Sequence, residues 1–200
     1  FDYVGVDRET GAAQFRNHEG KIVASSELTD EDMTDIGSAI PKFTYGITLN
    51  LEYKGFDFTA FGTGVAGNKI FNILYRADSP LRNSLKYYMD NAWTPENKGA
   101  SMPAVNNVAT DLNFWSSSAA MFNGSYFKIK QLQLGYTLPK RLTQKVAIKD
   151  LRFFVSLDDF FTFSNYPGMD PETATTGNNG GAGFDIGSYP TMKKCSFGAS

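Results

Sequence analysis

Two close pairs of carboxylates are the residues of this 200-residue sequence whose types and spacing could do chemistry. They are Asp158 with Asp159, and Asp170 with Glu172 across Pro171. Two carboxylates that flank a glycosidic bond can act as general acid and as base or nucleophile in glycoside hydrolysis. Carboxylates are also common at strand ends and in turns, and we expect these four in such structural roles. A glycosidase therefore ranks third among the functions considered.

Other residue types that do catalysis or bind metals are sparse. His18 is the only histidine and lies in a polar stretch, which predicts a solvated side chain rather than a ligand or a base; no nucleophile elbow accompanies it. Cys195 is the only cysteine, which excludes an intrachain disulfide and a thiolate zinc site. The acidic run at 30–35 lacks the spacing of a calcium loop, and Thr29 is placed to cap the amides that follow it. The sequence thus predicts no enzyme, no metal and no cofactor.

The composition favours β-structure and disfavours nucleic acid as a partner. Aromatic residues make up 14% of the chain, with 17 Phe and 10 Tyr beside 19 Gly, a combination typical of β-proteins. With 19 Lys and Arg against 21 Asp and Glu the formal charge is -2, so the chain has no basic field for a phosphate backbone. The mean hydropathy of -0.30 suits a soluble protein, and it equally suits strands that alternate lipid-facing and lumen-facing residues.

The clearest pattern is an alternation of apolar and polar residues. Apolar residues occupy every odd position from 43 to 53: Phe43, Tyr45, Ile47, Leu49, Leu51 and Tyr53. Polar residues and a glycine occupy the even positions, which predicts a strand with one apolar face. Such a strand is longer than the usual length of about 5–6 residues and matches the roughly 9–11 that cross a bilayer. Its aromatic ends flank an aliphatic centre, as the two interfaces of a membrane favour.

Four further strands are predicted along the chain. Lys54-Gly55 indicates a tight hairpin turn. The strands that follow it lie near 56–64, 126–138, 151–159 and 191–200. In the strand at 126–138 the apolar phase changes at Lys130-Gln131, which predicts a β-bulge that keeps a single apolar face.

The connections between these strands differ in length. Those at 54–55 and 139–149 are short, whereas those at 65–125 and 160–190 are long. Because consecutive strands are antiparallel, short and long connections fall at opposite ends of the sheet, as in outer-membrane barrels with short periplasmic turns and long extracellular loops. Five strands do not close such a barrel, so residues 1–200 are expected to be a segment of something larger. The alternative is a soluble extracellular β-sandwich that binds carbohydrate through aromatic residues of its loops.

Six motifs, in order, resemble those of a known family. They are Ile36-Gly37-Ser38 followed by Pro41-Lys42-Phe43-Thr44-Tyr45-Gly46, then Leu51-Glu52-Tyr53-Lys54-Gly55-Phe56-Asp57, Trp93-Thr94-Pro95-Glu96-Asn97, Gly124-Ser125-Tyr126-Phe127-Lys128-Ile129-Lys130 leading to Leu134-Gly135-Tyr136-Thr137-Leu138-Pro139, Asn165-Tyr166-Pro167-Gly168-Met169-Asp170-Pro171-Glu172, and Tyr189-Pro190. By these motifs nearly the whole chain resembles the C-terminal barrel region of the SusC/RagA-like TonB-dependent transporters of Bacteroidetes outer membranes.

This resemblance implies an all-β fold in which antiparallel strands form the C-terminal part of a transmembrane β-barrel of about 22 strands with a plugged lumen. It also implies TonB-dependent import of glycans or oligopeptides through the outer membrane, with a SusD-like surface lipoprotein as the lid. TonB would act through the plug region, and outer-membrane lipid would contact the barrel wall. The plug domain, the TonB box and the aromatic residue that normally ends the family's last strand are missing from these residues, so we expect a fragment.

Aromatic residues in the long connection at 65–125 are the candidate contacts for a substrate or a lid. They are Tyr87, Tyr88, Trp93, Phe114 and Trp115. An exposed ring face there could stack on a sugar, line a peptide path or contact the lid, because loops carry binding residues disproportionately. The simpler interpretation is that these rings pack the loop against itself or against the lid.

Overall fold

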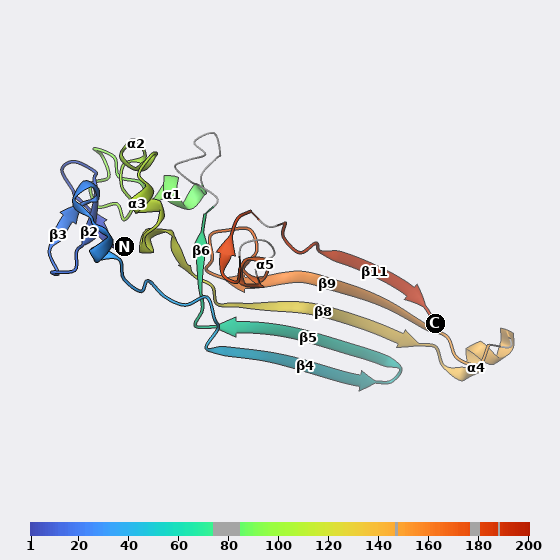
Figure 1. The fold of residues 1–200 in the computed structure, drawn as a ribbon. Helices are drawn as coiled ribbons and strands as arrows, with labels where there is room; N and C mark the ends of the chain where they lie inside the picture. The colour runs from blue at the N-terminus through green and yellow to red at the C-terminus, as the bar shows by residue number, and fades with distance from the viewer. Residues whose placement is uncertain (74–84, 147, 177–180, 188) are drawn as a thin grey trace.

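The structure of the chain is a computed structural model that describes residues 1–73, 85–146, 148–176, 181–187 and 189–200. A sheet of five long strands dominates it, and the long connections gather at one end of this sheet together with the N-terminal residues (Figure 1). None of the described helices is both long enough and apolar enough to span a membrane.

The five long strands form one antiparallel sheet in the order β11-β9-β8-β5-β4. Their bounds are Phe43–Tyr53 for β4, Phe56–Ala66 for β5, Tyr126–Thr137 for β8, Arg152–Ser164 for β9 and Lys194–Ala199 for β11. Each strand pairs with the next long strand along the chain, so the sheet is a meander, the connectivity of up-and-down barrels. The all-β, antiparallel class predicted from the alternation is confirmed.

The phase change in β8 is a β-bulge, as predicted. Two adjacent residues of β5, Phe61 and Gly62, pair with Gln131 and Ile129, so Lys130 is an extra residue in β8. Beyond it the apolar residues of β8 move from odd to even positions and stay on the same face of the sheet.

Strand β9 is irregular at the same level. Asp158 pairs with Gln131 and Phe161 pairs with Ile129, so Asp159 and Phe160 lie between these two pairs, opposite Lys130. Asp159 has a φ of 57°, a left-handed conformation that Asp reaches more readily than most residues. The pattern therefore breaks here, which is why the sequence predicted an end near 159, whereas β9 continues to Ser164.

The short connections lie at the end of the sheet opposite the long ones (Figure 1). Lys54 and Gly55 join β4 to β5 with φ angles of 50° and 88°, the positive values that a two-residue hairpin turn needs. Between β8 and β9 the chain forms the short helix α4 (Lys140–Thr143) and the 3-10 turn η4 (Gln144–Val146). This separation of short from long connections follows from the antiparallel order.

The N-terminal residues form a small antiparallel sheet for which the sequence analysis assigned no strand. It has the order β1-β2-β3, with β1 at Asp2–Val6, β2 at Ala13–Arg16 and β3 at Ile22–Ala24. The 3-10 turns η1 (Ser25–Glu27) and η2 (Asp30–Asp32) follow it.

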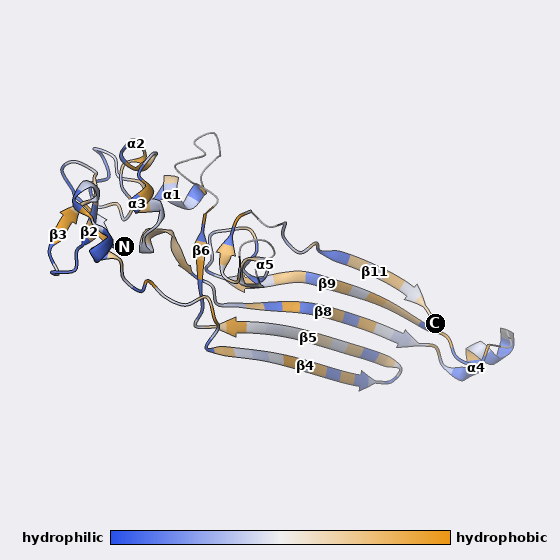
Figure 2. Ribbon diagram, in the orientation of Figure 1, coloured by the Kyte–Doolittle hydropathy of each residue, from blue (hydrophilic) through white to orange (hydrophobic). Residues whose placement is uncertain are grey.

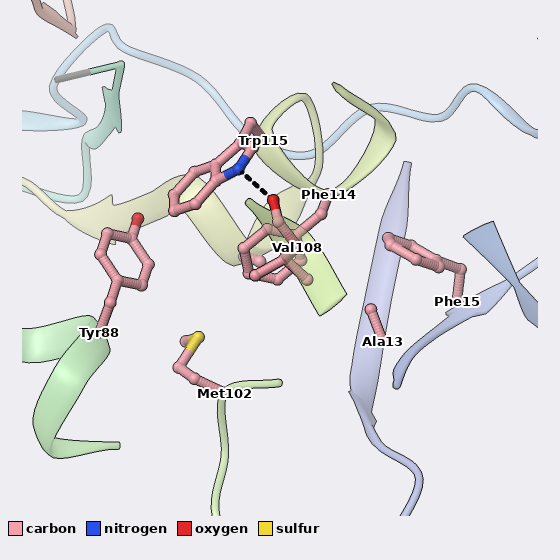
Figure 3. Close-up of a cluster of buried hydrophobic side chains, with 8 residues drawn as sticks. Ala13, Phe15, Tyr88, Met102, Val108, Phe114 and Trp115 are labelled. Atoms are coloured by element: carbon pink, nitrogen blue, oxygen red, sulfur yellow. Dashed lines mark hydrogen bonds between the residues drawn. The ribbon is translucent and has the colours of Figure 1, made fainter. Parts of the chain in front are cut away.

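The first long connection folds into short helices that pack on this small sheet. They are α1 (Lys86–Asp90), α2 (Val105–Val108), α3 (Leu112–Trp115) and the 3-10 turn η3 (Ser118–Ala120). Phe15 from β2 and Phe114 from α3 are buried in their shared core (Figure 3). The Trp115 indole N–H donates a hydrogen bond of 2.8 Å to the Val108 carbonyl, which ties α3 to α2 (Figure 3).

A second small sheet joins the two long connections. Its order is β10-β6-β7, with β6 at Lys69–Asn72, β7 at Met121–Asn123 and β10 at Phe184–Asp185. The helix α5 (Pro171–Thr176) precedes β10. The segments expected as long loops at 65–125 and 160–190 therefore contain secondary structure and are tied to each other.

His18 is partly solvated, but it also has a partner that the sequence analysis did not foresee. Its Nδ1 lies 2.6 Å from the Asp32 carboxylate, and its backbone N–H donates to the same oxygen at 2.9 Å. Asp32 also accepts from the Thr29 N–H at 2.8 Å and so takes part in the capping box of this turn, whose N-cap residue is Thr29. The backbone amides of His18 and Thr29 lower the pKa of Asp32, and the hydrogen bond to Asp32 raises the pKa of His18.

We predict that this pair stabilises the N-terminal sheet over a limited pH range. The raised pKa of His18 makes its contribution complete below about pH 6.5, and the contribution is lost as the pH rises through the raised value. The lowered pKa of Asp32 makes its contribution complete above about pH 3.9, and this is lost in stronger acid. NMR titration of labelled histidine in the solubilised receptor should show a raised His18 pKa that falls in Asp32→Asn. A His18 pKa at or below about 6.5 would contradict the prediction.

Candidate functional site

One face of the five-stranded sheet is apolar from edge to edge. Because residues paired across antiparallel strands share a face, the register fixes its rows. One row at mid-sheet is Leu51, Phe58, Leu134, Val155 and Phe197, and the next is Leu49, Ala60, Leu132, Leu157 and Cys195. Figure 2 shows the resulting alternation of hydrophobic and hydrophilic residues along β4 and β8.

Aromatic side chains form a band at each end of this apolar face. The band at the turn end comprises Tyr53, Phe56, Tyr136 and Phe153, and the band at the loop end comprises Phe43, Tyr45, Phe127 and Phe163. Ring centroids lie 4.5 Å apart for Phe56 and Tyr136, and 5.9 Å apart for Tyr45 and Phe127. Two aromatic bands around an aliphatic centre are the arrangement found at the two interfaces of membrane barrels.

The apolar face is uncovered within the described part of the chain. Phe197 is 89% exposed, Tyr53 69% and Leu51 54%. Soluble monomers rarely expose apolar patches of such extent. A β-sandwich would bury these side chains against a second sheet, and the structure shows them bare instead, which is evidence against the sandwich alternative.

Two glycines of β5 make room for the aromatic band at the loop end. A Cβ on Gly64 would lie 2.5 Å from the Tyr45 ring, and one on Gly62 would lie 2.5 Å from the Phe127 ring. The Tyr45 ring, from β4, therefore lies over Gly64 of β5, and the Phe127 ring, from β8, lies over Gly62 of β5. Glycine at these positions is required by close approach of the rings, although it weakens a strand in general.

The opposite face of the sheet is mainly polar, with Phe61 and Phe154 among its side chains. Its mid-sheet row is Asn50, Thr59, Gln133, Ser156 and Ser196, all neutral hydrogen-bonding side chains. Toward the turn end, the Arg152 Nε donates to Asp57 at 2.8 Å. This ion pair crosses β8 above Gly135, where a side chain would collide with both partners.

A denser group of charges lies toward the loop end of the polar face. This lysine–carboxylate cluster comprises Lys128, Lys130, Asp159, Asp170 and Glu172. Lys128, which is 2% exposed, lies 3.0 Å from Asp170 and 2.8 Å from Glu172. Lys130 lies 2.6 Å from Asp159 and 3.1 Å from Glu172. Burial alone would raise the pKa of Asp170, but the Thr191 backbone N–H and Lys128 outweigh it, and the pKa is lowered.

The cluster contains three of the four carboxylates considered for glycoside hydrolysis. Asp159, Asp170 and Glu172 each contact a lysine, so ammonium groups occupy the space between them. The fourth, Asp158, accepts a hydrogen bond from the Ser156 hydroxyl at 2.8 Å. This geometry offers structural ion pairs rather than two carboxylates that face a sugar. Lys128 and Lys130 were not among the candidate residues predicted from the sequence, although their spacing on one strand face was visible.

The five aromatic candidates of the loop divide into two groups. Phe114, Tyr88 and Trp115 are 1%, 6% and 7% exposed and pack in the core shared with the N-terminal sheet (Figure 3). Rings so deeply buried offer no free face to a sugar, peptide or lid, so they position the loop. Tyr87 and Trp93 are half-buried, and their contact role stays a prediction.

Comparison with known proteins finds similarity to much longer receptors. No family model matches it. TonB-dependent receptor P3 of Formosa agariphila is 32% identical over 200 residues, which cover 96% of this chain and 19% of that protein. TonB-dependent receptor P26 of the same bacterium is 25% identical over 194 residues, which cover 94% of this chain and 19% of that protein.

Solved structures share the fold. The RagAB peptide importer in its open-open state matches with a TM-score of 0.74 and 23% identity, covering 99% of this chain and 21% of that one. Its closed-closed state matches with a TM-score of 0.73 and 23% identity, covering 99% of this chain and 22% of that one. The chain thus spans about a fifth of the length of the proteins that it matches.

Neighbouring residues of β4 with opposite orientations allow a test of which face meets lipid. Leu49→Arg places a charge near the middle of the apolar face and should cost roughly 2–4 kcal/mol of the free energy of unfolding in a bilayer. Thr48→Arg, on the polar face, should cost much less. Urea unfolding of the full receptor in lipid vesicles measures both, and equal losses would contradict the assignment of the faces.

Proposed function

We propose that this chain, a relative of the TonB-dependent receptors along nearly its whole length, forms part of the wall of an outer-membrane importer. The observation that carries the proposal is the uncovered apolar face with an aromatic band at each end. Its strands β4 and β5 have 11 residues each, enough to cross a bilayer when tilted. The polar face then lines the interior of the barrel.

Transport by this importer requires no covalent reaction, and no residue of this chain acts as a catalyst. Cargo reaches the loop end of the barrel from a SusD-like surface lipoprotein that acts as a lid, and TonB acts on a plug in the lumen. The cargo class is glycans or oligopeptides, polar oligomers too large for passive diffusion. Support comes from the relatives named TonB-dependent receptors and from the fold shared with the RagAB peptide importer. This chain contributes wall strands and the two long connections, 65–125 and 160–190, at one end of them.

Uptake by cells tests this function. Cells that carry the full receptor, its lid lipoprotein and TonB should take up a fluorescent oligosaccharide or oligopeptide, and loss of any one component should abolish uptake of the true cargo. Testing both labelled classes in parallel identifies the cargo. The proposal would be contradicted if the receptor inserts in the outer membrane but its loss changes the uptake of neither the oligosaccharide nor the oligopeptide.

The two half-buried aromatic candidates give a test of the lid contact. Trp93 donates a hydrogen bond of 3.0 Å to the Arg8 carbonyl, and Tyr87 packs edge-on against Phe122 with centroids 5.2 Å apart. Each side chain therefore contacts its own loop and is also partly exposed, so that a lid could contact it. We predict that Tyr87→Ala and Trp93→Ala lower the amount of lid lipoprotein that copurifies with the receptor. Lys149→Ala, an exposed change at the opposite end of the sheet, is the control; an equal loss in it, or none in either variant, would contradict the contact.

A further inference from the structure

The segment that follows β9 folds back over the polar face of the sheet. We call residues 165–176 the inner arm; it ends with α5, which lies beside β8 and β9 near their loop end (Figure 1). Lys128 belongs to the polar face of β8, since its neighbours Phe127 and Ile129 belong to the apolar one. The Lys128 contacts to Asp170 and Glu172 therefore place the inner arm against the inside of the wall.

The inner arm has a second anchorage, away from the charges. Ala174 is fully buried in a small cluster with Ile70 of β6 and Tyr166. The Asn68 side chain donates to the Thr175 hydroxyl at 3.0 Å, and that of Asn72 donates to the Tyr166 hydroxyl at 2.9 Å. Tyr166 in turn donates to Asp185 of β10. The arm is thus held between β8 and the small sheet β10-β6-β7.

The charges of the lysine–carboxylate cluster couple the inner arm to the wall. Wall residues supply Lys128, Lys130 and Asp159, and the arm supplies Asp170 and Glu172. If the arm lifted, Lys128 would keep only Asp159, at 3.9 Å. Lifting the arm would also admit water to Lys128, so what holds the arm down is the attraction of Lys128 and Lys130 to Asp170 and Glu172 across 2.8–3.1 Å, which lifting would break.

We infer that the inner arm is a constriction inside the transport path, held against the barrel wall by the lysine–carboxylate cluster, and that it limits the size of what passes. The inference rests on the proposed function, because the polar face lines a conduit only in a barrel. It assigns the β9–β11 connection to the interior, whereas the sequence predicted an outward loop there. Lys128 and Glu172 are positioning residues, since they act through the arm.

Three variants of the full receptor grade the strength of the anchorage. Lys128→Met leaves three carboxylates facing one lysine, so it should release the arm most. Glu172→Gln leaves two lysines with two carboxylates and should release it partly; because Glu172 is less buried, this variant keeps the test available if Lys128→Met does not assemble. Asp57→Asn breaks the ion pair with Arg152 on the same face at the turn end, which anchors no part of the arm, and is the matched control.

Two cysteine reporters, each in a Cys195→Ser background, follow the arm and the path. Ala174→Cys reports whether the arm has lifted, because this position is fully buried. Gln133→Cys lies on the polar face, closer to the turn end than Lys128, and is therefore beyond the arm for a reagent that enters from the loop end. Intact cells are treated with a small and a large membrane-impermeant maleimide. In the parent, only the small reagent should label Gln133→Cys, and neither should label Ala174→Cys.

The inference expects Glu172→Gln and Lys128→Met to raise labelling at Ala174→Cys and to admit the large reagent to Gln133→Cys, with Asp57→Asn unchanged. Unchanged labelling at Ala174→Cys would overturn the anchorage. Labelling there without entry of the large reagent would overturn the constriction. A parent receptor in which neither reagent labels Gln133→Cys would overturn the constriction, because something other than the arm would then close the path. A receptor that does not insert in the outer membrane would instead contradict the proposed function.

Discussion

A one-residue bulge in β8 sets both faces of the sheet. Side chains alternate with a period of two, so the extra residue Lys130 reverses the phase of everything after it. Without that reversal Leu132 and Leu134 would face the polar side, and the apolar face would end halfway along β8. In a bilayer such an interruption places polar groups against lipid, which is costly at mid-depth. The continuity of the apolar face therefore depends on this one position.

The same bulge supplies one of the two ammonium groups that hold the inner arm. An extra residue adds one side chain to one face, and here the Lys130 ammonium joins that of Lys128 on the polar side. The irregularity in β9 at this level presents Asp159, 2.6 Å from Lys130. The bulge that restores the apolar register thus also adds Lys130 to the contacts that Lys128 makes with the arm. Bulges are common at barrel rims and near functional sites for this reason.

The long strands could be predicted from the sequence because the alternation of apolar and polar residues within each strand shows that one of its faces is apolar and the other polar. The alternation at 43–53 needs no knowledge of neighbours, and the phase change at Lys130 has one local explanation. The N-terminal strands could not be predicted this way, since β2 and β3 have only four and three residues, too few for a period to emerge. The continuation of β9 was hidden because Asp159 adopts a left-handed backbone that interrupts the pattern.

Only those parts of the candidate site whose residues lie close together in the sequence could be predicted. The carboxylates on either side of Pro171 are visible in the sequence, but their partner Lys128 lies 42 residues from Asp170. Coulomb energy depends on distance in space and on burial, neither of which a charge pattern reveals. Loop aromatics pose the same problem, because Trp93 and Phe114 look alike in sequence and differ only in what packs on them. What the sequence did contain was two lysines flanking Ile129 on a strand whose other face is apolar. On such a strand a cation must face the polar side, where it requires an acidic partner once it is buried.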